Sequence, residues 1–171
     1  IHSVSGFNVP NISSDSEIIL SKLFSGWGVG MWDHKDPFSQ VESMREPYKD
    51  MIKNKLESKV KFYHPTLHKN LKTVDIEKIC LNDVIYTYLL IKHDLFQIRP
   101  TKTLVKNIGL DGSGVHCSPD SRFSSPRLSD KKLNTNALPE YNRKFDKEIY
   151  DFFYPAIGRY HRLRKLFLKI H

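Results

Sequence analysis

The stretch from Thr73 to His93 has the strongest helical periodicity in the chain and constrains the fold more than any other segment. Asn82 lies where its side chain can cap a new helix, so the stretch can form two helices instead of one. In the two-helix arrangement Asp83 occupies the first turn of the second helix. Its apolar residues predict a buried helical layer.

Short apolar segments on both sides of this region predict strands. One is residues 1–9, and two more are residues 96–98 and 103–106, separated by Arg99-Pro100-Thr101. Residues 17–24 are apolar enough to form another buried element. Helices combined with a few short strands predict the α+β class.

Amphipathic patterns predict three further helices, and the rest of the C-terminal region reads as a loop. The helices are residues 41–60, residues 141–152 ending at Tyr154-Pro155, and a basic helix over 156–171. Residues 118–136 are rich in Ser, Pro and Lys and predict an extended loop. We therefore expect a domain over 1–117, this loop, and a helical, basic C-terminal part over 137–171.

The composition sets limits on the class of protein. The 171 residues carry 27 Lys and Arg against 19 Asp and Glu, a net charge of +8, which favours polyanionic partners. No apolar run approaches the ~18 residues of a membrane-spanning helix, and two cysteines suggest a reducing, cytoplasmic compartment. The chain begins with Ile1 and has no signal-peptide pattern, so we expect a fragment or a processed product.

Residues 26–32 hold three glycines and two tryptophans, Trp27 and Trp32. An indole ring offers a flat surface on which a sugar or a base can lie, although tryptophan more often belongs to a core. Asp33 and His34 follow directly and could orient hydroxyl groups of a ligand, while a helix cap accounts for Asp33 equally well.

The segment 107–116 is a glycine-rich loop followed by a histidine. Gly109, Gly112 and Gly114 would let backbone N–H groups approach phosphate oxygens, a pattern that is common and weakly specific. His116 can be a metal ligand or a surface histidine. His64 and His68 have the i, i+4 spacing of a metal pair, but Pro65 interrupts them, and we expect no metal site there.

Several of these motifs occur in one order that resembles the C-terminal half of bacterial family 2 glycosyltransferases. The matching residues are Ser5-Gly6-Phe7, Trp27-Gly28, Met31-Trp32-Asp33, Asn82-Asp83, Pro100 and the stretch LVKNIGLDGSGVH at 104–116. The last stretch is the specific part of the resemblance. Three positions depart from the family pattern, where Val29, Asn82 and Val115 replace Trp, Trp and Thr.

The resemblance implies an incomplete GT-A domain, the acceptor-side part of an inverting enzyme that transfers a sugar from a nucleotide-sugar to a glycan or lipid-linked acceptor in bacterial surface polysaccharide synthesis. The half that holds the nucleotide-sugar would precede Ile1, because the chain contains no Asp-Xaa-Asp motif to bind the diphosphate through a divalent metal, Mn or Mg. Alone, the chain should not transfer sugar.

The resemblance also implies roles for individual residues. Asp83 would be the catalytic base, with a helix-capping carboxylate as the alternative. Acceptor contacts would come from Trp27, Trp32 and Asp33. Contacts to the diphosphate would come from Asn107, Gly109, Gly112 and Gly114, and His116 would reach the metal.

The alternative function is a non-catalytic basic module that binds a membrane surface or nucleic acid. Residues 156–171 combine five cations with an apolar helical face, which suits either an anionic membrane surface or docking on the protein. Nucleic acid is the less favoured partner, because no helix-turn-helix, RNA-recognition or zinc signature appears. A glycosyltransferase with this tail would be cytoplasmic and peripheral at the inner face of the membrane.

Overall fold

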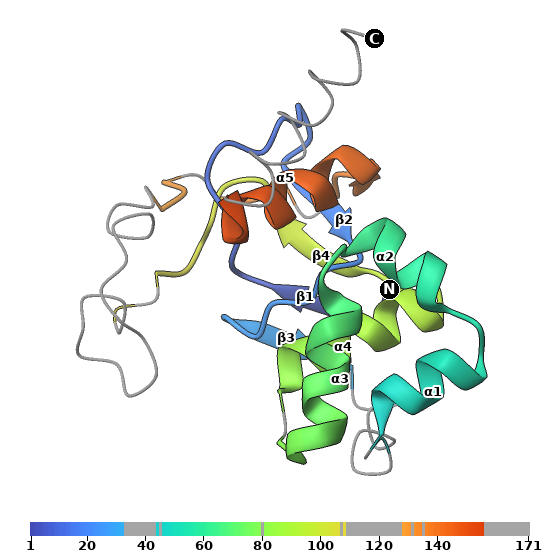
Figure 1. Ribbon diagram of the computed structural model, residues 1–171. Coiled ribbons are helices and arrows are strands. Elements are labelled where there is room, and N and C mark those ends of the chain that lie inside the picture. Colours follow the sequence, from blue (N-terminus) through green and yellow to red (C-terminus); the bar gives the residue numbers. More distant parts are fainter. Residues whose placement is uncertain are drawn as a thin grey trace, which may run out of the picture.

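The computed structural model describes residues 1–32, 44, 46–79, 81–106, 108, 128–130, 132–134 and 136–155. These residues form five helices and one five-stranded sheet, and the helices gather over one side of the sheet (Figure 1). The α+β class predicted from the sequence is therefore confirmed. No helix among the described residues is long and apolar enough to cross a bilayer.

The sheet is mixed and built from short strands. They are β1 (Ser3–Ser5), β2 (Ile18–Ser21), β3 (Val29–Met31), β4 (Gln97–Pro100) and β5 (Glu140–Tyr141), in the order β3-β1-β4-β2-β5. β4 is the central strand, parallel to β1 and antiparallel to β2, while β3 and β5 form the two edges.

Of the strands predicted at 96–98 and 103–106, the first is present as β4 and the second is absent. Arg99 and Pro100 do not separate two strands but belong to β4. Residues 103–106 are irregular, because the Leu104 N–H donates to the Gly6 carbonyl and the Thr103 carbonyl accepts from Ser129 outside any ladder. Segment 1–9 does contain a strand, β1, and the buried element at 17–24 contains β2.

The sheet face beneath the helices is unusually polar. Ser3, Gln97 and Ser21 lie side by side in register on this face, and Arg99 follows two residues after Gln97. All four are buried, whereas Val4 on the opposite face is 37% exposed. Because polar residues occupy the buried face of the sheet, each of their buried polar groups requires a hydrogen-bond partner. The same arrangement places a charged side chain, that of Arg99, in the middle of the fold.

The helices are α1 (Pro47–Lys53), α2 (Glu57–Tyr63), α3 (Leu67–Glu77), α4 (Asn82–Lys92) and α5 (Arg143–Phe153). The prediction of one helix over 41–60 is wrong, because the backbone turns at Asn54 and Lys55, where Lys55 has a φ of 56°. The stretch 73–93 does divide into two helices, but the first of them, α3, begins earlier than predicted, at Leu67. Asn82 is the first helical residue and not the cap, a position that Leu81 occupies.

Two helix N-termini are capped in different ways. In α5 the Asn142 side chain accepts the Lys144 N–H, the usual local cap. In α1 the local cap is absent, and both carboxylate oxygens of Asp75 in α3 accept the backbone N–H groups of Tyr48 and Lys49, at 3.1 and 3.0 Å. The start of α1 is thus fixed by a residue of a different helix.

The described residues form two hydrophobic clusters. One lies between α1, α2, α3 and α4 and contains Met51, Leu71 and Leu89, each fully buried. The other lies between α5, β2 and the segment that follows β1, and contains Phe7, Ile19 and Phe145. The candidate site lies where these two clusters meet.

Candidate functional site

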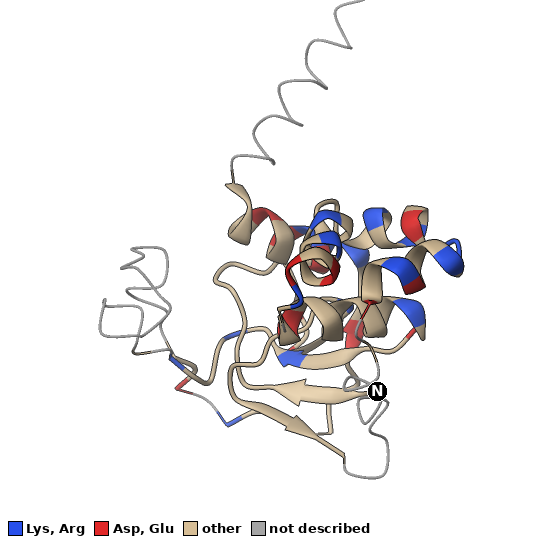
Figure 2. Cartoon of the chain, turned by 60° about the horizontal axis from the view of Figure 1, so that its bottom comes forward, with Lys and Arg blue, Asp and Glu red and all other residues tan. Residues whose placement is uncertain are grey.

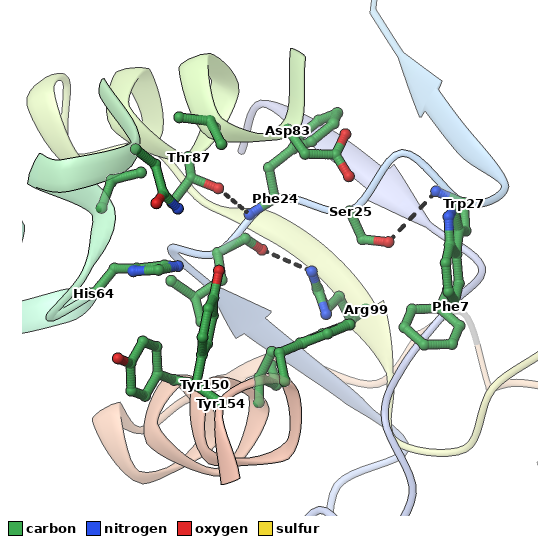
Figure 3. Close-up of a pocket in the computed structure, with 16 residues that line it drawn as sticks. Phe7, Phe24, Ser25, Trp27, His64, Asp83, Thr87, Arg99, Tyr150 and Tyr154 are labelled. Atoms are coloured by element: carbon green, nitrogen blue, oxygen red, sulfur yellow. Dashed lines mark hydrogen bonds between the residues drawn. The ribbon is translucent and has the colours of Figure 1, made fainter. Parts of the chain in front are cut away.

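A cavity of about 190 Å³ opens between α4, α5 and the loop that follows β2 (Figure 3). Most of its wall is apolar or aromatic. The polar and charged residues that line it are Ser25, His64, Asn70, Asp83, Thr87, Arg99, Tyr150 and Tyr154. A concave, mainly apolar site with a few convergent polar groups is the usual form of a small-molecule pocket.

Residues 22–27 form the wall between the sheet and α4, and polar contacts from both elements hold them. The Phe24 N–H donates to Thr87 Oγ1 in α4 at 3.0 Å, and the Ser25 N–H donates to Gln97 Oε1 in β4 at 2.9 Å. Arg99 donates from Nη2 to the Leu23 carbonyl at 2.8 Å. These bonds fix the backbone on which Trp27 is carried.

Asp83 lies at the mouth of this cavity, in the first turn of α4. The residue is exposed to solvent on one side, while a Cβ added to Gly26 would lie only 3.1 Å from its Oδ1, so the glycine allows the carboxylate to approach the loop. Partial burial raises the pKa of Asp83, and the Gly26 N–H and the Arg99 charge act in the opposite direction. The site therefore holds an accessible carboxylate whose affinity for a proton is increased.

Trp27 is part of the same cavity wall. Its ring packs edge-on against Phe7 with the centroids 4.3 Å apart, and its carbonyl accepts the Ser5 hydroxyl at 2.9 Å. Gly28, which follows, has a φ of 62° and lets the chain turn into β3. Trp27 therefore packs on the core and also lines the cavity, so its position is compatible with both roles considered from the sequence, a core residue and a flat surface for a ligand.

Of the other predicted site residues, the structure describes only Trp32, and it does not join Asp83 and Trp27. Trp32 lies beyond the end of β3, is 41% exposed, and does not line the cavity. The remaining predicted residues are outside the described part of the chain: Asp33, Asn107, Gly109, Gly112, Gly114 and His116.

Arg99 is the site residue that the sequence analysis missed. It is 1% exposed, and burial lowers its pKa to about 10 while Asp146 and Asp83 act to raise it, so the guanidinium remains charged at neutral pH. Its Nε and Nη1 have no hydrogen-bond partner among the described residues. The only signal in the sequence was an arginine in a short strand-like segment.

Asp146 in α5 lies behind Arg99, away from the cavity. It accepts hydrogen bonds from Ser21 Oγ at 2.7 Å, from the Lys22 N–H at 3.0 Å and from Tyr141 at 3.4 Å. Burial raises the pKa of Asp146 to about 6 in spite of these donors and of the Arg99 charge. The carboxylate therefore balances the buried guanidinium and attaches α5 to the sheet.

The cavity contains one histidine. Burial lowers the pKa of His64 to about 4, so its ring is neutral at pH 7, and it packs edge-on against Tyr150 and Tyr154. Within the described residues no group of His, Cys, Asp or Glu could hold a metal ion.

Comparisons of the chain with protein-family models, with curated proteins and with solved structures gave no match.

Proposed function

We propose that the chain is the acceptor-side part of a GT-A glycosyltransferase that transfers a sugar to a glycan or lipid-linked acceptor. The main observation behind the proposal is that Asp83 and Trp27 line the same cavity. The two residues are 56 positions apart, and the family resemblance assigns both of them to the acceptor side. Surface polysaccharide synthesis in bacteria is the setting that the resemblance favours.

In this proposal Asp83 accepts the proton of the attacking acceptor hydroxyl. The oxygen then forms a bond to the anomeric carbon, the bond to the nucleoside diphosphate breaks, and the configuration inverts. A carboxylate with a raised pKa holds the transferred proton better than an ordinary aspartate does. Because Asp83 is also accessible to solvent, an acceptor can reach it without displacing the loop.

The donor would be held elsewhere. The nucleotide-binding half would precede Ile1 in the same protein, and Asn107, Gly109, Gly112, Gly114 and His116 would contribute from this chain. The described residues alone do not supply a metal site. A divalent metal, Mn or Mg, would neutralise charge on the leaving diphosphate when bound.

We expect the isolated chain to bind nucleoside diphosphates weakly, because in this proposal the diphosphate is held mainly by residues outside these 171. Calorimetric titration with UDP, GDP and CDP in the presence of Mn²⁺ should give a Kd above ~100 μM, while a protein extended to include the nucleotide-binding half should bind one of them at least tenfold more tightly. Sub-micromolar binding by the isolated chain, which requires ~8 kcal/mol of interaction, would contradict the proposal.

We further propose that the enzyme works at the cytoplasmic face of a membrane, with residues 156–171 in contact with anionic lipid. On the described helices Lys and Arg alternate with Asp and Glu (Figure 2), with ion pairs such as Lys61–Glu57 and Lys92–Asp50. The five cations of segment 156–171 have no acidic neighbour within it. This concentration of charge favours a membrane surface over nucleic acid as the partner.

Reversing the charge of Arg162, Arg164 and Lys165 to Glu should release the protein from anionic vesicles and leave its melting temperature nearly unchanged. The reason is that attraction to lipid headgroups depends on charge and is screened by salt, whereas docking on protein through an apolar face is not. Vesicle sedimentation and thermal unfolding measure the two effects. If the variant still sedimented with the vesicles, or if its melting temperature fell sharply, we would conclude that residues 156–171 pack on the protein and do not bind the membrane.

A further inference from the structure

Ser25 is held at both of its backbone groups by one buried side chain, that of Gln97 in β4. The Ser25 N–H donates to Gln97 Oε1 at 2.9 Å, and Gln97 Nε2 donates to the Ser25 carbonyl at 3.2 Å. A third bond, from Nε2 to Ser3 Oγ at 3.1 Å, connects the same amide to β1. Gln97 is fully buried, so water does not compete for these bonds. The amide therefore holds Ser25 as a neighbouring strand would.

The two residues that follow Ser25 reach the candidate site. The Gly26 N–H donates to the Asp83 carboxylate, and a Cβ added to Gly26 would lie only 3.1 Å from Asp83 Oδ1. The Trp27 N–H donates to Ser25 Oγ at 3.4 Å, and in Figure 3 Ser25 lies between Asp83 and Trp27. A displacement of Ser25 would therefore be transmitted to the carboxylate and to the indole.

Gly26 does not hold this position by its own chemistry. It is exposed, it has no side chain, and glycine has the greatest backbone freedom of all residues. The bonds from Arg99 to the Leu23 carbonyl and from the Phe24 N–H to Thr87 hold the chain before Ser25. Gln97 is thus the buried group whose bonds lie directly beside Gly26 in the sequence.

We propose that Gln97 is a positioning residue for the catalytic base: by bonding both backbone groups of Ser25, it fixes the Gly26 N–H against the carboxylate of Asp83. This inference rests on the proposed function, because it takes Asp83 as the base. It deepens that function by adding a residue that is not part of the cavity wall. A base acts efficiently only when it is held close to the productive geometry, so support of this kind affects the rate.

The position of Gly26 can be measured on the 171-residue chain without an assay of transfer. An amide N–H bonds more strongly to an ionised carboxylate than to a protonated one, so we expect the Gly26 N–H resonance in NMR spectra to change between about pH 4 and 8. Asp146 and His64 titrate in or near this range, while the Arg99 charge stays constant. Asp83→Asn should abolish the change, which identifies Asp83 as its source.

Gln97→Met should reduce the amplitude of this change at least about threefold. Methionine has a similar length and offers no amide, so both backbone groups of Ser25 lose their partner. The matched control is Asn8→Leu, which also replaces a fully buried amide, one that donates to the Pro100 carbonyl at 2.8 Å and does not line the cavity. It should retain the full amplitude.

If Gln97→Met does not fold, Gln97→Asn takes its place. Asparagine keeps a buried amide in the sheet, but its side chain is about 1.5 Å shorter and cannot reach both backbone groups of Ser25. The amplitude at Gly26 should fall in this variant as well.

The effect on catalysis is measured in the enzyme that includes the nucleotide-binding half. Gln97→Met should lower kcat about tenfold, with the Kd for the nucleotide-sugar unchanged and Asn8→Leu at the wild-type rate. The pH below which kcat/KM falls should move upward, because loss of the Gly26 donor raises the pKa of Asp83. A purely structural role of Gln97 would not move this pH.

The inference is overturned if the Gly26 resonance does not follow Asp83 in the wild type, if the Gln97 variants keep the full amplitude, or if Asn8→Leu loses it equally. It is also overturned if Asp83→Asn lowers kcat while Gln97→Met changes neither kcat nor the pH profile. Failure of the proposed function gives a different result. In that case Gly26 behaves as described, but neither Asp83→Asn nor Gln97→Met changes kcat, so Asp83 is positioned by Gln97 and is not the base.

Discussion

Replacing Asp83 with Asn should lower kcat for sugar transfer by about 10²-fold or more in the enzyme that includes the nucleotide-binding half. The amide keeps the shape of the carboxylate and can still accept from the Gly26 N–H, but it cannot take a proton from the acceptor hydroxyl. Because the donor is held elsewhere in this proposal, the Kd for the nucleotide-sugar should change little. Steady-state kinetics with both substrates varied separates the two effects.

The matched control for this experiment is Glu77→Gln. It makes the same chemical change at an exposed residue at the end of α3, outside the residues that line the cavity, and should leave kcat at the wild-type value. If Asp83→Asn transferred sugar at the control rate, Asp83 would be a structural carboxylate at the start of α4, and the assignment of the catalytic base would be wrong.

A second large effect is expected on stability, from the buried Asp146. Its pKa in the folded protein is raised to about 6 from its ordinary value of 3.8, so between these pH values the folded state binds more protons than the unfolded state does. The contribution of Asp146 is therefore most favourable below about pH 4 and decreases as the pH rises to about 6. The total decrease is about 3 kcal/mol in the free energy of unfolding.

Asp146→Asn should remove this pH dependence. Its Oδ1 can still accept from Ser21 and from the Lys22 N–H, while the cost of burying a charge disappears. Urea unfolding of both proteins at pH 4, 5, 6 and 7 measures the difference. The variant should match the wild type near pH 4 and exceed it by about 3 kcal/mol at pH 7.

The control is Asp15→Asn, at an exposed aspartate, which should give a curve parallel to the wild type. A difference between Asp146→Asn and the wild type that stays constant with pH would show that the pKa of Asp146 is not raised in the folded protein. A difference that changes sign, so that the variant is the less stable protein at pH 7, would show that the ionised carboxylate stabilises the fold through Arg99.

Helices with long apolar repeats were predictable from the sequence, and the shorter elements were not. α3 and α5 each contain eleven residues and bury one face, so their periodicity is visible in the sequence. α4 is equally long, but its buried residues include the consecutive run 87–91, so it is visible as a long apolar segment and not as a one-sided repeat. β3 and β5 contain three and two residues, too few for an alternating pattern. The break between α1 and α2 has no glycine or proline, since Lys55 adopts the positive φ, and nothing local in the sequence indicates it.

Of the residues that line the cavity, only those that belong to a sequence motif were named as site residues from the sequence. Asp83 and Trp27 were named from the family resemblance, and the structure brings them to the same cavity. Arg99 and His64 were not assigned to a site, because their importance depends on burial beside residues far away in the chain, which a single sequence does not specify. Asp146 could not be distinguished from a solvated helix residue, since two of its hydrogen-bond donors, Ser21 and Lys22, lie more than 120 positions earlier in the chain.

The capping of α1 by Asp75 has a consequence for how the protein folds. A helix of seven residues is far too short to persist alone in water, and two of its first N–H groups are bonded to a carboxylate about 26 positions further along the chain. α1 can therefore form only after, or together with, α3. These two helices make one cooperative unit, and any event that detaches α3 from the helical layer also unwinds α1.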